Sequence, residues 1–194
     1  MDAQTYFLML HEHAHFRGKA ARVLEEPTPD QWRTMLPGHN SIAWIVWHVA
    51  RGEDWAVTTM LQGTEQLLTR DGWDVSMNIA RRDFGAGMTP AEVAELSARI
   101  NLDALRGYYN AVAAETRRFV GDFDFDTLDE PLDLQGRLAL APEAVGPSES
   151  IRRLIERWTT KRPYLNVMTL IDMFHHFDEA DHMCRLLMPD REFP

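Results

Sequence analysis

The chain contains a single cysteine, Cys184, among its 194 residues. One thiol excludes an intrachain disulfide and is typical of proteins from reducing compartments. The chain also lacks an uncharged apolar run of the roughly 18 residues that a membrane-spanning helix needs. Its N-terminal sequence, MDAQTYFLMLHEHAHFRGKA, has neither the basic flank nor the long apolar core of a secretory signal. We therefore expect a cytoplasmic protein that has no membrane partner.

Basic side chains are few, because 20 Lys and Arg stand against 30 Asp and Glu, for a formal net charge of −10. A chain this acidic repels the phosphates of nucleic acid and of anionic membranes. Hydrophobic residues make up 45% of the chain, which excludes a disordered protein. The length suits a single domain, residues 1–194, and we expect its partners to be small molecules rather than nucleic acid.

Patterns typical of β-strands are almost absent, whereas four long segments have helical periodicity: about residues 3–26, 41–63, 89–121 and 149–188. Asn40 or Ser41 can cap the second segment, and Thr89 opens a capping box at the third. Pro163 is expected to kink the last segment or to divide it. The sequence therefore predicts an all-α fold, a four-helix bundle with long connecting loops.

The two long connections cover residues 64–87 and 122–146. We expect the first to be a loop with a turn or two of helix, and long loops in compact domains are often functional. Its Trp73, Arg81 and Arg82 are candidates for shaping the mouth of a substrate site. Within the second connection, the stretch LDLQGRLAL is a candidate for an extended segment.

The inward face of the last helix decides which of its polar side chains are site candidates, because helical bundles build their sites in the interior. Positions three and four apart share one face of a helix. Extending the face that begins with Tyr164 and Met168 predicts these inward residues: Ile171, His175, Asp178 or Glu179, His182 and Leu186. The neighbouring His176 and Asp181 fall off this face, so we expect them to contact solvent.

The second helix contributes one inward imidazole, that of His48, which lies within the apolar stretch WIVWHVA. His48 with a histidine and a carboxylate of the last helix makes a set of two imidazoles and one carboxylate. This is a usual ligand set for a divalent metal with an open coordination position, and it suits zinc, nickel or iron. A metal-free alternative is a buried hydrogen-bond network, in which Asp178 accepts from His182 or His48.

Other polar residues are weaker candidates. His11 and His15 share one face of the first helix and form a second possible metal pair. Glu53 is expected on a solvated face, although Arg51, Glu53 and Asp54 can also form ion pairs or support His48. Cys184 points away from His182 and is expected to be a small packed residue rather than a nucleophile.

Two motifs, HNSIAWIVWHVARGEDW and RRDFGAGMTPAEVAELS, together with the histidine-bearing last helix, resemble the DinB/YfiT-like superfamily over about residues 10–187. The resemblance implies a four-helix bundle that binds a divalent metal through three side chains. It assigns His48, Asp178 and His182 as ligands, with His175 as the alternative to Asp178. A carboxylate as the first of the two ligands on the last helix is a feature of the branch that resembles mycothiol-dependent maleylpyruvate isomerase. Characterised relatives use the metal to activate a low-molecular-weight thiol.

Two hypotheses about function follow. The first is a metal-dependent enzyme, a thiol S-transferase or a related enzyme with metal-assisted nucleophilic chemistry on a small-molecule substrate. The second is a non-catalytic, stress-related helical bundle, in which the His/Asp cluster is the buried hydrogen-bond network. We expect a homodimer in either case, because six tryptophans leave much apolar surface to cover.

Overall fold

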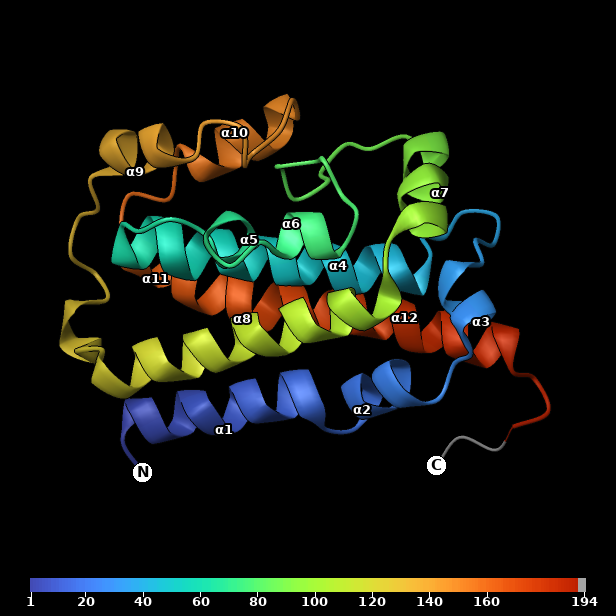
Figure 1. Ribbon diagram of the computed structural model, residues 1–194. Helices are drawn as coiled ribbons and strands as arrows, with labels where there is room; N and C mark the ends of the chain where they lie inside the picture. The colour runs from blue at the N-terminus through green and yellow to red at the C-terminus, as the bar shows by residue number, and fades with distance from the viewer. Residues whose placement is uncertain (192–194) are drawn as a thin grey trace.

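The computed structural model describes residues 1–191, and within them the chain forms helices and no strand. Four long helical segments pack side by side (Figure 1). In chain order they are α1 (Ala3–Phe16) with α2 (Lys19–Glu25); α4 (Ile42–Asp54) with the π-helix η1 (Trp55–Gln62); α8 (Leu102–Asp122); and α11 (Lys161–Asn166) with the π-helix η3 (Val167–Ile171) and α12 (Asp172–Leu187). The predicted all-α fold is confirmed.

Shorter helices occupy the connections between these segments: α3 (Pro29–Arg33), α5 (Leu67–Arg70), α6 (Trp73–Ser76), α7 (Pro90–Arg99), η2 (Phe125–Thr127), α9 (Leu134–Leu140) and α10 (Glu149–Ile155). The turns of helix expected in the first long connection are α5 and α6. The second connection contains α9 where an extended segment was considered, so that option is wrong. Figure 1 shows α9 and α10 above the bundle and α7 at a steep angle to it.

Three predicted helices are interrupted. The first breaks between Phe16 and Lys19, and the last breaks between Ile155 and Lys161. The third breaks before α8 because the Asn101 side chain accepts the backbone N–H groups of the first turn and so starts a new helix. Pro163 lies in the first turn of α11, where a missing N–H costs little, so it neither kinks nor divides a continuous helix.

Helix α4 lies at the centre of the molecule, and all 13 of its residues are buried. Ser41 caps it as predicted, by accepting the N–H of Trp44. Three charged residues of this helix, Arg51, Glu53 and Asp54, have no exposed surface. Because a buried charge is costly without a partner, we expect each of them to contact a polar or charged group in the interior. Arg51 pairs with Asp54 at 3.4 Å, one of the ion pairs that these three residues could form, whereas the expected solvation of Glu53 is wrong.

The π-helix η3 changes the direction in which α12 faces. Its backbone bonds span five residues instead of four, as in the N–H of Asp172 bonding to the carbonyl of Val167. Met168, Thr169 and Leu170 are buried within η3, and the buried face of α12 then runs through Met173, Phe177, Ala180 and Cys184. One extra residue rotates the following helix by about 100° relative to an unbroken α-helix. The inward face predicted for α12 is consequently wrong.

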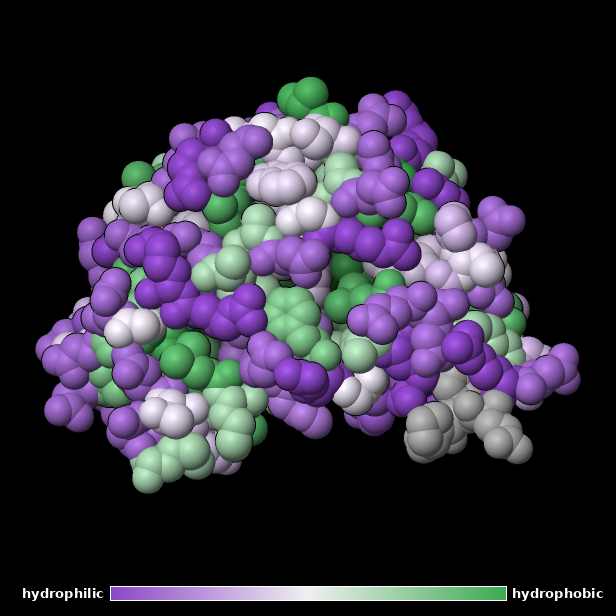
Figure 2. All heavy atoms as spheres, turned by 60° about the horizontal axis from the view of Figure 1, so that its bottom comes forward, coloured by the Kyte–Doolittle hydropathy of each residue, from purple (hydrophilic) through white to green (hydrophobic). Residues whose placement is uncertain are grey.

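The surface on the side of α1 and α2 is mostly hydrophilic, with small hydrophobic areas between the polar side chains (Figure 2). Tyr6 and Met9 of α1 are each 50% exposed.

No helix within residues 1–191 is long and apolar enough to cross a membrane.

Candidate functional site

Three side chains from two bundle helices meet beside η3: His48 of α4, and Asp172 and His176 of α12. Their candidate ligand atoms all lie within 4.8 Å of one another. Asp172 Oδ2 is 4.0 Å from His48 Nε2, and Asp172 Oδ1 is 3.6 Å from His176 Nε2. Asp172 and His176 are four residues apart, so they point from adjacent turns toward the same imidazole of α4. We call these three residues the bundle triad.

The His48 ring is held by contacts that leave one nitrogen for a ligand. Its Nδ1 lies against the carbonyl oxygen of Phe84, and since that oxygen only accepts, Nδ1 carries the proton. The ring stacks on Trp44 with centroids 4.6 Å apart. Nε2 then presents its lone pair toward Asp172, which is the arrangement found when a histidine binds a metal. Burial, followed by the neighbouring His176, lowers the pKa of His48 and favours the neutral ring that a metal needs.

On its other side, His176 faces Glu179, which is itself bonded to Asn40. Its Nδ1 is 3.5 Å from Glu179 Oε2, and Glu179 Oε1 accepts the backbone and side-chain N–H groups of Asn40 at 3.2 and 3.3 Å. The nearby His176 and these N–H donors lower the pKa of Glu179 despite its partial burial. The carboxylate of Glu179 therefore stands next to the outer nitrogen of His176, the position of the partner that commonly orients a metal-binding imidazole.

The loop that receives His48 is anchored at several points. The backbone N–H of Phe84 bonds to the carbonyl of Ala144 at 3.1 Å, and Asp83 accepts the N–H of Gly85 at 2.7 Å. Gly85 has φ +85°, and a Cβ there would come within 2.6 Å of the Trp47 ring. Glycine is therefore required for this loop to approach α4 closely enough to reach His48.

A pocket of about 400 Å³ opens over the bundle triad. Loop residues Phe84–Met88 form one wall, and Ile151, Leu154, Ile155 and Trp158 of α10 and its following turn form the other. The lining is apolar apart from Asn40 and the triad at its base. Such a pocket suits a small organic molecule whose reacting group reaches the triad.

Of the four side chains predicted as metal ligands, the structure places only His48 in the triad. Asp178 is exposed and pairs with Lys19 at 2.5 Å, while His182 is exposed beside His39 with ring centroids 5.3 Å apart. His175 is exposed as well. The prediction that these three residues face inward is wrong because the π-turn of η3 rotates α12.

The same rotation accounts for the two residues that were expected to contact solvent. His176 belongs to the triad, and Asp181 is buried, with Arg22 Nε at 2.6 Å. Asp172 was not considered from the sequence. Its spacing of four from His176 places both side chains on one helix face, but in an unbroken helix that face is not the predicted inward one.

A second buried cluster combines His11 and His15 of α1 with Glu53 of α4. The predicted common face of the two histidines is confirmed, since their rings stack at 4.0 Å. A His/Glu cluster of this composition could also hold an ion.

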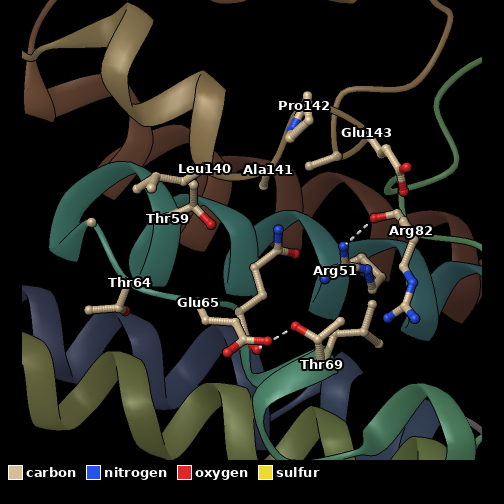
Figure 3. A pocket seen from close by; sticks show the side chains of 14 residues that line it. Arg51, Thr59, Thr64, Glu65, Thr69, Arg82, Leu140, Ala141, Pro142 and Glu143 are labelled. Atoms are coloured by element: carbon tan, nitrogen blue, oxygen red, sulfur yellow. Dashed lines mark hydrogen bonds between the residues drawn. The ribbon is translucent and has the colours of Figure 1, made fainter.

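A different pocket, of about 460 Å³, lies between the start of the first long connection and the end of α9 (Figure 3). Arg51 and Thr59 face Leu140, Ala141 and Pro142 across it. One residue of this pocket, Arg51, affects the triad indirectly. Its Nη2 donates to the carbonyl of Arg82 at 2.5 Å and so helps to hold the loop that reaches His48. Arg82 lines this pocket rather than the one over the triad.

The other two residues expected at a substrate mouth also lie elsewhere. Arg81 pairs with Asp83 at 2.8 Å, and Trp73 packs against Tyr108 with ring centroids 6.1 Å apart. The loop shapes the mouth of the pocket over the triad with the backbone and side chains of Phe84–Met88 instead.

Comparison with known proteins supports the family assignment. The family model of the DinB superfamily matches residues 12–183. A crystal structure of a conserved protein from Enterococcus faecalis is similar, with a TM-score of 0.69 and 19% sequence identity, over 97% of this chain and 99% of that one. At this identity the likeness shows the fold alone. A comparison with curated proteins finds no significant match.

Proposed function

Since the chain belongs to the DinB superfamily, we propose that it is a divalent-metal-dependent enzyme acting on a small organic molecule, with His48, Asp172 and His176 as the metal ligands. The observation that carries the proposal is the position of the triad at the base of a mostly apolar pocket of about 400 Å³. Its donor set of two imidazoles and one carboxylate fits zinc, nickel or iron and leaves a coordination position for a reactant.

The protonation of the ligands fits the same role. Nδ1 of His48 is committed to the Phe84 carbonyl, which directs Nε2 inward. The carboxylate of Asp172 faces both imidazoles, and the carboxylate of Glu179 lies 3.5 Å from His176 Nδ1 outside the triad. A divalent metal held there supplies Lewis acidity, which favours the deprotonated and nucleophilic form of a thiol or of water.

We further propose a thiol as the nucleophile and an S-transfer reaction, as the family resemblance implies. The chain's own residues would bind and orient the reactants. Walls formed by Trp44, Met88 and Trp158 would exclude water and contact the apolar body of the substrate. Cys184 is not this thiol, because it is buried in the core and burial raises its pKa to about 12.

Cobalt substitution tests the site and the thiol together. Protein purified without a His tag would be loaded with Co²⁺ and titrated with N-acetylcysteine, and a sulfur-to-cobalt charge-transfer band in the near ultraviolet is expected. Asp172→Asn should lose the band, whereas Asp178→Asn should keep it. Absence of the band in wild-type protein that has bound more cobalt than Asp172→Asn would overturn the thiol proposal and leave water as the nucleophile.

The non-catalytic alternative makes the opposite prediction about metal. The contact of Asp178 with Lys19 removes Asp178 from the network proposed for it, but the triad with Glu179 and Asn40 could still serve as a metal-free polar network. In that case EDTA would lower the melting temperature of wild type no more than that of Asp172→Asn. A metal held by the triad is expected to make the drop larger in wild type than in Asp172→Asn, because a ligand bound only to the folded state stabilises it.

A further inference from the structure

The second buried cluster, made of His11, His15 and Glu53, lies in the protein interior. These side chains are 0%, 1% and 0% exposed. Helix α1 supplies both histidines and α4 supplies the carboxylate, so the cluster links the first helix of the bundle to the central one. None of its residues belongs to the bundle triad or lines the pocket over it.

The two carboxylate oxygens of Glu53 face different imidazoles. Oε1 is 2.8 Å from His11 Nε2, with the geometry of a hydrogen bond. Oε2 is 2.9 Å from His15 Nε2, but this pair lacks that geometry. Both of these atoms, although buried, have no hydrogen-bond partner within the described residues. An imidazole nitrogen and a carboxylate oxygen that lie this close without hydrogen-bond geometry are placed as two ligands of a shared ion would be.

The surroundings of the carboxylate point the same way. Glu53 has no exposed surface, and its carboxylate faces the imidazoles of His11 and His15 rather than a Lys or Arg side chain. A carboxylate enclosed in this way is costly to bury unless a cation accompanies it.

We propose that His11, His15 and Glu53 bind a second divalent metal ion, of the zinc type, as an enclosed structural centre that joins α1 to α4. Two imidazoles and one carboxylate match the ligand preferences of such an ion. Packing orients the rings: His11 lies on Phe7 at 5.9 Å, and His15 lies beside Tyr109 at 5.2 Å. Because the ligands are enclosed, the ion would stabilise the fold and take no part in substrate binding.

The decisive experiment leaves this cluster intact and removes the bundle triad. Wild-type protein, the variant His48→Ala/His176→Ala and the same variant with Glu53→Gln would each be unfolded in guanidinium with EDTA, refolded and titrated with Zn²⁺. We expect two tightly bound zinc ions per chain, then one, then none. Zinc should raise the melting temperature of the first variant and leave that of the second unchanged.

The outcomes separate this proposal from the proposed function. The inference is overturned if the His48→Ala/His176→Ala variant folds but binds no zinc and Zn²⁺ does not change its melting temperature. The cluster is then a metal-free network. If wild type binds one ion and this variant still binds one, the second centre stands and the bundle triad is empty. Should Glu53→Gln fail to fold, the titration of the variant with an intact cluster still decides, and Glu53→Asp offers a shorter carboxylate for comparison.

Discussion

His48 donates its Nδ1–H to the backbone carbonyl of Phe84, a residue 36 positions further along the chain. This one bond directs Nε2 toward Asp172 and determines which nitrogen is free to bind a metal. The loop that contains Phe84 is held in turn by Arg51, which donates to the carbonyl of Arg82. The orientation of the candidate ligand therefore depends on a loop as well as on the helix that carries it.

The triad can be tested against the ligands expected from helical phase alone. His48→Ala, Asp172→Asn and His176→Ala should each lose one equivalent of bound metal per chain, because three protein ligands are the usual minimum for a catalytic site. Mass spectrometry of metal content, with circular dichroism to confirm folding, makes the measurement. Asp178→Asn and His182→Ala are matched controls on the same helix and should keep their metal. Loss of metal in these controls with retention in Asp172→Asn would reverse the assignment.

The close approach of the Phe84 loop can be tested at Gly85. A Cβ at this position meets the Trp47 ring at 2.6 Å and also strains a backbone with φ +85°. Gly85→Ala should therefore cost about 2–5 kcal/mol of stability, from left-handed strain of about 1–2 kcal/mol plus overpacking of about 1–3 kcal/mol. Its metal affinity should fall about tenfold or more as His48 loses its support.

Gly87 provides the control for that substitution. Its φ is +86°, but a Cβ there would lie 3.5 Å from Ser148, an ordinary contact. Gly87→Ala should cost only the strain of about 1–2 kcal/mol and should leave metal affinity unchanged. Urea unfolding and zinc titration of both variants make the comparison, and equal effects at the two glycines would contradict it.

Asp181 should contribute stability that depends on pH. Burial alone raises its pKa, but Arg22 and Arg185 outweigh burial, so the pKa lies below the ordinary value of 3.8. A depressed pKa means that the contribution is complete above the unfolded value and disappears as the pH falls through the folded value. Asp181→Asn should lose about 1.5–3 kcal/mol at pH 7, as for a buried charged hydrogen bond.

Urea unfolding from pH 7 down to pH 3 measures this dependence. The gap between wild type and Asp181→Asn should stay constant at neutral pH and narrow below about pH 4. Asp178→Asn, which removes an exposed pair with Lys19 on the same helix, should change stability little at any pH. A gap that widens toward acid would contradict the assigned direction of the pKa.

Cys184 should be inert in the folded protein. Burial, with a smaller contribution from Asp181, raises the pKa of its thiol to about 12, and the side chain has no exposed surface. A disulfide reagent such as DTNB should label no thiol in native protein at pH 8 and one per chain in guanidinium. Rapid labelling of native protein would show that α12 opens locally or that this packing is wrong.

Local sequence signals account for much of the fold. Ser41 and Thr89 begin helices as their side chains predict, and the inward position of His48 follows from the apolar stretch around it. Where helices end was less predictable. The breaks before Asn101 and Lys161 interrupt segments whose periodicity continues across them, since the pattern of apolar residues does not show where the chain turns.

The sequence by itself determined the all-α class, the capped starts of the helices and the inward imidazole of α4, because these depend on neighbours within a few residues. Only the tertiary structure decided which face of α12 meets that imidazole. A single five-residue turn in η3 moves Asp172 and His176 inward and turns His175, Asp178 and His182 outward. The contacts of His48 with Phe84 and of Glu53 with α1 likewise join residues distant in the chain, and no local pattern specifies such pairs.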